Sequence, residues 1–138
     1  MKISGKHLDV ESLENIGINV ARLLCAGDIK TVAQKFGYAL SYNRDIASAI
    51  GEDLSRELKK VGSSALNAAG RPLAISVRYF DSNESNLFAL IEVRIQTSDF
   101  ASILVELIVS TKERDTYVTL EDISAIGTFN EICGQPDN

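Results

Sequence analysis

Few side chains in this sequence have the type and spacing needed for acid–base, nucleophilic or metal chemistry. His7 is the only histidine, and it precedes the first predicted helix, where we expect a solvated side chain. A general base needs a fixed position within hydrogen-bond reach of its proton. Ser–His, Cys–His and multi-histidine metal sites would all have to use His7. The glycines form neither G-x-G-x-x-G nor G-x-x-x-x-G-K-[ST]. We therefore expect no catalytic residues, no metal and no cofactor, and a protein that is not an enzyme.

The two cysteines, Cys25 and Cys133, are far apart and lack C-x-x-C spacing. Cys25 lies in the apolar run 23–26 and is expected to be a small buried side chain. Cys133 lies in a tail that we expect to be loosely ordered. No apolar run is long enough to span a membrane, and the first nine residues contain no apolar core of an export signal. We expect a cytoplasmic protein without disulfides or membrane contact.

The net charge of −5 comes from 19 acidic and 14 basic residues. This sign disfavours nucleic-acid binding, because phosphate backbones repel it. Two interpretations remain open. The charge can serve solubility alone, or it can attract a basic protein partner such as a nuclease.

The first half of the chain has the apolar spacing of three amphipathic helices. A capping residue precedes each of them: Asp9, Asp28, and Asn43 or Asp45. Glycines end the first two helices: Gly27 and Gly37. The third helix has a continuous apolar stripe. Charged residues that we expect to be solvated form its other face: Glu52, Asp53, Arg56, Glu57, Lys59 and Lys60.

The second half alternates between apolar and polar residues in strand-length runs. Four strands are predicted, over Leu73–Phe80, Leu87–Thr97, Ser102–Thr111 and Thr116–Ala125. Short connectors between them favour an antiparallel meander. The fold class is therefore α+β, with three N-terminal helices packed on one face of a curved four-stranded antiparallel sheet. We expect a single domain over residues 1–138, loosely ordered at 1–8 and 127–138.

Carboxylates lie both on the strands and in their connectors. Glu92 and Arg94 share a strand face, and Glu106 is on the outward side of the next strand, which is compatible with simple cross-strand charge pairing. Glu121 and Asp122 are adjacent, so alternation predicts that they point to opposite faces. The connectors place four carboxylates at one end of the sheet, as an acidic rim: Asp81, Glu84, Glu113 and Asp115. Turns also favour such residues for conformational reasons, so turn preference alone could explain the rim. We select this rim, together with Glu121, as the candidate surface for a basic protein partner.

Two other interpretations of the same residues stay open. A pocket between helices and sheet could be lined by aromatic hydroxyls and one carboxylate: Tyr38, Tyr42, Tyr79 and Asp122. It would suit a small ligand or lyase-type chemistry. Alternatively, a homodimer could form through the outward sheet face, because alternation places apolar residues beside Glu92 and Arg94 there: Phe80, Phe88 and Leu90.

Two segments of the C-terminal half resemble those of a known family. The run Leu104-Val-Glu-Leu-Ile-Val109 precedes a charged turn and then Asp115-Thr-Tyr-Val-Thr-Leu-Glu-Asp122. They are similar to the V-E-L/V-x-L-like and D-L-T-L-E-like strands of small bacterial NTF2-like domains found among toxin-immunity proteins. Gly27-Asp28-Ile29-Lys30 is similar to the G-D-hydrophobic element of such domains. The chain departs from the pattern at Tyr117-Val118, where the family has aspartate and leucine, and it has no tryptophan.

The resemblance implies an NTF2-like, or cystatin-like, fold in which a curved sheet wraps around helices. It also implies an immunity protein that binds a cognate toxin domain and occludes its active site. The paired His/Asp residues of catalytic NTF2-like enzymes have no counterpart in this sequence. The resemblance therefore favours a binding protein, with an NTF2-like small-ligand binder or lyase-type enzyme as the alternative.

Overall fold

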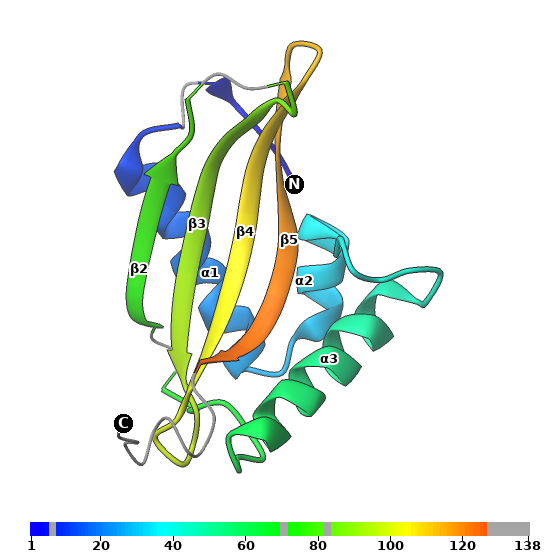
Figure 1. Ribbon diagram of the computed structural model, residues 1–138, viewed down its shortest axis with the longest axis vertical. Coiled ribbons are helices and arrows are strands. Elements are labelled where there is room, and N and C mark those ends of the chain that lie inside the picture. Colours follow the sequence, from blue (N-terminus) through cyan, green and yellow to red (C-terminus); the bar gives the residue numbers. More distant parts are fainter. Residues whose placement is uncertain (6–7, 70–71, 82–83, 127–138) are drawn as a thin grey trace.

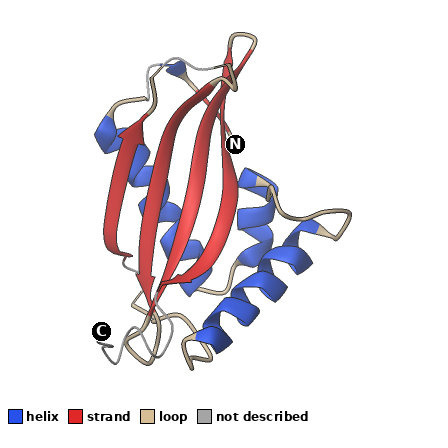
Figure 2. Ribbon diagram, in the orientation of Figure 1, coloured by secondary structure: helices blue, strands red, loops and turns tan. Residues whose placement is uncertain are grey.

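A five-stranded antiparallel sheet, with helices behind one of its faces, forms the computed structural model of this protein (Figure 1). The structure describes residues 1–5, 8–69, 72–81 and 84–126. The elements in chain order are β1 (Lys2–Ile3), α1 (Val10–Cys25), α2 (Ile29–Phe36), α3 (Ile46–Lys60), β2 (Pro72–Tyr79), β3 (Leu87–Gln96), β4 (Ser102–Lys112) and β5 (Asp115–Ile126). The α+β class is confirmed, and Figure 2 shows how helices and strands occupy separate layers.

The same short sequence pattern starts each helix. Asp9 accepts a hydrogen bond from the Ser12 backbone N–H at 3.2 Å, and Asp45 accepts one from Ser48 at 3.0 Å. Asp28 does the same for Thr31 at 3.3 Å. Each aspartate thereby satisfies a backbone donor that the first turn of a helix leaves unpaired. The third helix is therefore capped by Asp45 rather than by Asn43.

The expectation of four strands is wrong, because the start of the chain adds a fifth. β1 pairs with β5 in the register Lys2↔Tyr117 and Ile3↔Thr116. Just beside it, Val118 donates its backbone N–H to the Met1 carbonyl at 2.6 Å. These bonds satisfy backbone groups at one end of β5 that would otherwise form an open sheet edge. A two-residue strand has no periodicity to detect, so alternation could not reveal it.

The core lies between the helices and the helix-side face of the sheet. Alternate residues of the central strands are fully buried there: Ile91, Val93 and Ile95 on β3, and Ile103, Val105, Leu107 and Val109 on β4. α1 crosses this face at Gly17, where a Cβ would lie 3.0 Å from the Val93 side chain. α3 instead lies beside β5 and packs against α2 and that strand (Figure 1). Helix packing thus covers one face of the sheet and leaves the other uncovered in the described structure.

A β-bulge at the start of β3 changes which side chains face outward. Leu87 pairs with Ser110 and Ala89 with Val109, so Phe88 is the extra residue. Phe88 packs against the core and meets the Tyr79 ring edge to face, with ring centroids 5.5 Å apart. The prediction that Phe88 shares the outward face with Glu92 and Arg94 is therefore wrong, since a bulge shifts strict alternation by one residue.

Cys25 lies partly buried against the core, while His7 and Cys133 fall outside the described residues. Across the described part of the chain, no helix combines the length and apolar character needed to cross a membrane.

Candidate functional site

Three carboxylates are aligned across the uncovered face of the sheet. The strand registers place Glu92 directly opposite Glu106, and Glu106 directly opposite Asp122. Side chains paired in this way have Cβ atoms about 5 Å apart, and like charges in this arrangement are destabilising. We refer to Glu92, Glu106 and Asp122 as the carboxylate row. The carboxylate row is therefore not a set of opposite charges paired across strands, because like charges face one another.

A second bulge adds Glu121 to the negative charge near the row. Leu107 pairs with Leu120 and Glu106 with Asp122, so Glu121 is the extra residue of β5. Leu120 and Ile123 are buried on the helix side, whereas Glu121 is exposed. The prediction that Glu121 and Asp122 point to opposite faces, one of them toward the apolar side, is wrong for this reason.

Glu106 lies at the centre of the row, and its environment disfavours the charged carboxylate. Partial burial raises its pKa, and the negative charges of Asp122, Glu92 and Glu121 raise it further. Arg78 opposes this shift. The row therefore concentrates negative charge that the chain itself compensates only in part.

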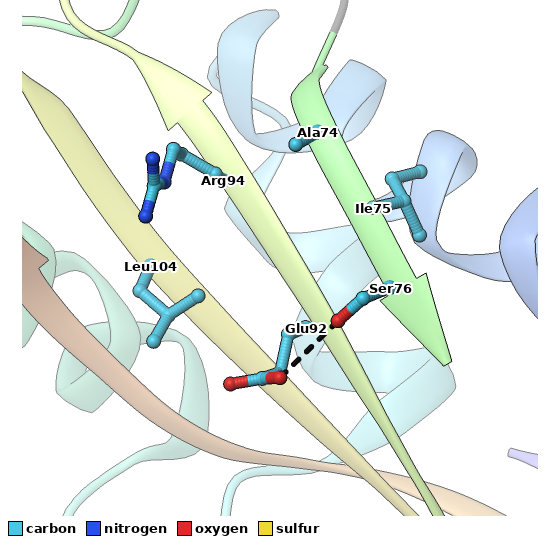
Figure 3. Close-up of a pocket in the computed structure, with 6 residues that line it drawn as sticks. All are labelled: Ala74, Ile75, Ser76, Glu92, Arg94 and Leu104. Carbon is cyan, nitrogen blue, oxygen red and sulfur yellow. Dashed lines mark hydrogen bonds between the residues drawn. The ribbon is translucent and has the colours of Figure 1, made fainter. Parts of the chain in front are cut away.

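A shallow hollow of about 300 Å³ adjoins the row on the β2 side. Ser76 donates a hydrogen bond to Glu92 Oε1 at 3.2 Å, and Arg94 and Leu104, which are paired across β3 and β4, also line the hollow (Figure 3). Two residues along the strands from the Glu92–Glu106 pair, Leu90 pairs with Ile108, and Leu90 is only 6% exposed. The uncovered face thus combines carboxylates, one guanidinium group at the hollow and aliphatic side chains.

The acidic rim selected from the sequence is placed at one end of the sheet but contains both signs of charge. The β2–β3 and β4–β5 connectors lie together there, since the Thr111 N–H donates to the Asn86 carbonyl at 3.0 Å. Asp81, Glu84 and Glu113 are exposed on these connectors. Asp115 forms an ion pair with Lys2 at 3.2 Å. Glu121 lies away from this end, at the bulge beside the carboxylate row.

The three tyrosines considered for a pocket are not brought together. The Tyr38 hydroxyl is buried and donates to Asp53 Oδ2 at 2.6 Å. Tyr42 is 72% exposed in the connector between α2 and α3. Tyr79 lies on β2, at the opposite edge of the sheet from β5, and donates to the Leu8 carbonyl at 2.6 Å. Asp122 lies near Tyr38, whose pKa it raises, although burial and Asp53 contribute more to that shift.

Asp53 is the centre of a buried polar cluster that the sequence pattern did not predict. Arg44 donates to both of its oxygens, at 2.9 and 3.2 Å, and Arg56 donates to Oδ1 at 3.0 Å. The hydrogen bonds from Arg44 lower the pKa of Asp53 to about 2, against the opposing effect of burial. The Tyr38 hydroxyl and all three guanidinium nitrogens of Arg44 have acceptors, which is the pattern of a structural cluster.

Glu57, one turn further along α3, joins this helix to β5. Its Oε1 accepts the backbone N–H of Ala125 at 3.0 Å, and its Oε2 lies 2.9 Å from Lys60 Nζ. Burial raises its pKa, but the hydrogen bonds from Lys60, Ala125 and Arg56 outweigh that effect and lower it. The expectation that Asp53 and Glu57 are solvated is wrong. Their positions beside the apolar stripe, three and seven residues after Ile50, are the signal that could have revealed this.

The carboxylate row predicts a gain in stability when its central charge is removed. We expect Glu106→Gln to raise the free energy of unfolding at pH 7 by about 0.5–1 kcal/mol, because two like-charged neighbours lose their repulsion. The pKa of Glu106 is raised from 4.5, so the wild type loses stability as pH rises through the folded-state pKa. The gain of the variant should therefore vanish near pH 4. Urea unfolding at both pH values measures it, with exposed Glu84→Gln as a control that should change little. Equal stability of wild type and Glu106→Gln at pH 7 would contradict the prediction.

Comparisons with known protein families, with curated proteins and with solved structures found no match to this chain. Within the described ranges, no group of three or more His, Cys, Asp or Glu residues is placed to hold a metal ion. The row runs in a line across the strands instead of converging on a point. The site is thus best described as a charged surface.

Proposed function

We propose that this chain is a protein-binding domain whose uncovered sheet face docks on a basic surface of a partner protein. More specifically, we propose that it is an NTF2-like immunity protein that occludes the active site of a cognate toxin, such as a nuclease. The observation that supports it is the direct pairing of Glu92 with Glu106 and of Glu106 with Asp122.

A row of paired like charges costs stability in the free chain, yet the sheet retains it on a face that none of the described helices covers. Lysine or arginine side chains from a partner would remove that cost and would also be steered toward a chain of net charge −5. A nuclease cleft is lined with such cations because it must hold phosphates. A sheet face laid over the cleft would block substrate entry without any chemistry in this chain.

Aliphatic side chains support the same surface. Leu104 lines the hollow beside Glu92, and Ile108 lies next to the row on β4. Protein interfaces bind most strongly where apolar anchors are flanked by complementary charges. The alternative pocket between helices and sheet gains no comparable support, because buried core side chains fill that space. A face-to-face homodimer is disfavoured because it would bring two carboxylate rows together.

The test uses the protein encoded by the adjacent open reading frame as the probe. We expect that protein to arrest growth when produced alone and to be neutralised by this chain. Neutralising the row with Glu92→Gln, Glu106→Gln and Asp122→Asn together should weaken binding about 100-fold, measured by calorimetry.

The matched control removes the same number of charges from the connectors, with Asp81→Asn, Glu84→Gln and Glu113→Gln together. We expect it to weaken binding by less than about tenfold, since peripheral charges act mainly on association rate. Failure of the adjacent protein to bind would overturn the proposal. So would a larger loss for the connector variant than for the row variant, because the docking surface would then be the rim.

A further inference from the structure

The two edges of the sheet differ in whether other segments satisfy their backbone groups. At the β5 edge, Met1, Ala39 and Glu57 all satisfy backbone groups: Ala39 donates to the Leu120 carbonyl at 2.9 Å, and Glu57 accepts from the Ala125 N–H at 3.0 Å. At the other edge is β2, and among the described residues no strand lies beyond it (Figure 1). An uncovered edge is a template for pairing with another strand.

The backbone of β2 directs alternate residues outward. Phe80 donates its N–H to the carbonyl of Phe88, its direct opposite on β3, at 2.9 Å. Because backbone groups of successive residues in a strand point to opposite sides, Ile75, Val77 and Tyr79 direct their N–H and C=O groups away from β3. These residues present a regular row of donors and acceptors along the edge.

The features that usually protect an exposed edge lie only near the two ends of β2. Pro72 is at its first residue, its register shift lies between Pro72 and Ala74, and the remainder pairs with β3 without interruption. Its only charged residue is Arg78. Ile75 and Val77 remain partly exposed on the helix side. Natural edge strands are normally protected by charged side chains, proline or a bulge, and the central segment Ile75–Val77 of β2 contains none of these.

We infer that the outer edge of β2 is a strand-pairing surface and that its occupant is β2 of a second copy of this chain. The two strands run antiparallel about a two-fold axis at Ser76. Ile75 of each copy then lies opposite Val77 of the other, and both residues have outward-directed backbone groups that bond to one another. The partly exposed Ile75 and Val77 side chains also become a cross-strand apolar pair on the helix side.

The charges of β2 fit this self-pairing. With Ser76 on the axis, Arg78 of each copy lies opposite Ala74 of the other, so no like charges meet. Both residues are exposed on the uncovered face. The pairing would join the two sheets into one and leave both carboxylate rows accessible. It is therefore independent of the function proposed above.

The test places opposite charges at one position. We expect Ala74→Glu to tighten the dimer about tenfold, because each new carboxylate faces Arg78 of the other copy, and Ala74→Lys to weaken it about tenfold. Sedimentation equilibrium from about 1 μM to about 1 mM measures both constants. Hydrogen exchange at high concentration should slow at the Ile75 and Val77 amides.

Three results would overturn the inference. The first is a wild-type chain that stays monomeric at about 1 mM, since the edge would then need a different occupant. The second is equal dimer constants for Ala74→Glu and Ala74→Lys. The third is a dimer whose newly protected amides lie outside β2. Both substitutions are at an exposed position, so we expect both variants to fold.

Discussion

Replacing Asp53 by alanine is expected to lower the free energy of unfolding at pH 7 by about 3 kcal/mol. The carboxylate is 3% exposed and accepts hydrogen bonds from Arg44, Arg56 and Tyr38. Alanine would leave two guanidinium groups and a buried hydroxyl without their acceptor. Arg44 and Arg56 are 33% and 58% exposed, so water can solvate them partly, which keeps the expected loss at the lower end for a broken buried pair.

The stabilisation that Asp53 contributes should also decrease as the pH falls. Its pKa is lowered from 3.8 to about 2, so the folded state holds the charged form more tightly than the unfolded state does. This contribution, on the order of 2 kcal/mol, is fully present above about pH 4 and is lost as pH falls toward about 2. The difference in stability between wild type and Asp53→Ala should shrink over that interval in urea unfolding.

Glu52→Gln provides the matched control for Asp53. Glu52 also pairs with Arg44, at 3.2 Å, but its side chain is 64% exposed. We expect a loss below about 1 kcal/mol, as for other exposed ion pairs. If Asp53→Ala costs no more than Glu52→Gln, the cluster does not stabilise the fold in the way described.

Gly17→Leu is expected to destabilise the protein by a similar amount, about 3 kcal/mol. At Gly17, α1 comes so close to the sheet that a Cβ would meet Val93 at 3.0 Å, Ile91 at 3.2 Å and Ile75 at 3.4 Å. A leucine side chain would have to displace these methyl groups or move the helix away from β2 and β3. Thermal and urea unfolding should both show the loss.

Gly51→Leu tests whether the effect comes from packing or from the substitution itself. Gly51 is also within a helix, but a Cβ there would meet nothing within 4 Å. Because glycine is a poor helix former, we expect this variant to be as stable as wild type or up to about 1 kcal/mol more stable. Similar losses for the two variants would show that close approach at Gly17 is not the cause.

The carboxylate row illustrates why a candidate functional surface can be invisible in the linear sequence. Glu92, Glu106 and Asp122 are 14 and 16 residues apart in the sequence, so only the register of three strands aligns them. The connector carboxylates can be recognised from the sequence because they lie in or beside predicted turns. Their end of the sheet, however, also contains Lys2, which pairs with Asp115 at 3.2 Å.

Asp53 and Glu57 show a related difficulty within a helix. Charged residues at the border of an apolar stripe can be solvated or buried, and the choice depends on what packs beside them. Here Arg44 and Tyr38, from the connector before α3, and the Ala125 N–H, from β5, supply the partners that make burial favourable. Those partners are 9, 15 and 68 residues away, respectively.

The linear sequence is enough to predict the three helices with their aspartate caps, the four longer strands and the short connectors of a meander. Helix capping and apolar periodicity depend on residues a few positions apart, so they can be recognised in the linear chain. Three features become visible only in the folded chain: the pairing of β1 with β5, the bulges at Phe88 and Glu121, and the alignment of Glu92, Glu106 and Asp122. These features follow from hydrogen bonds between distant strands, and a shift of one residue in register would have placed different side chains on the uncovered face.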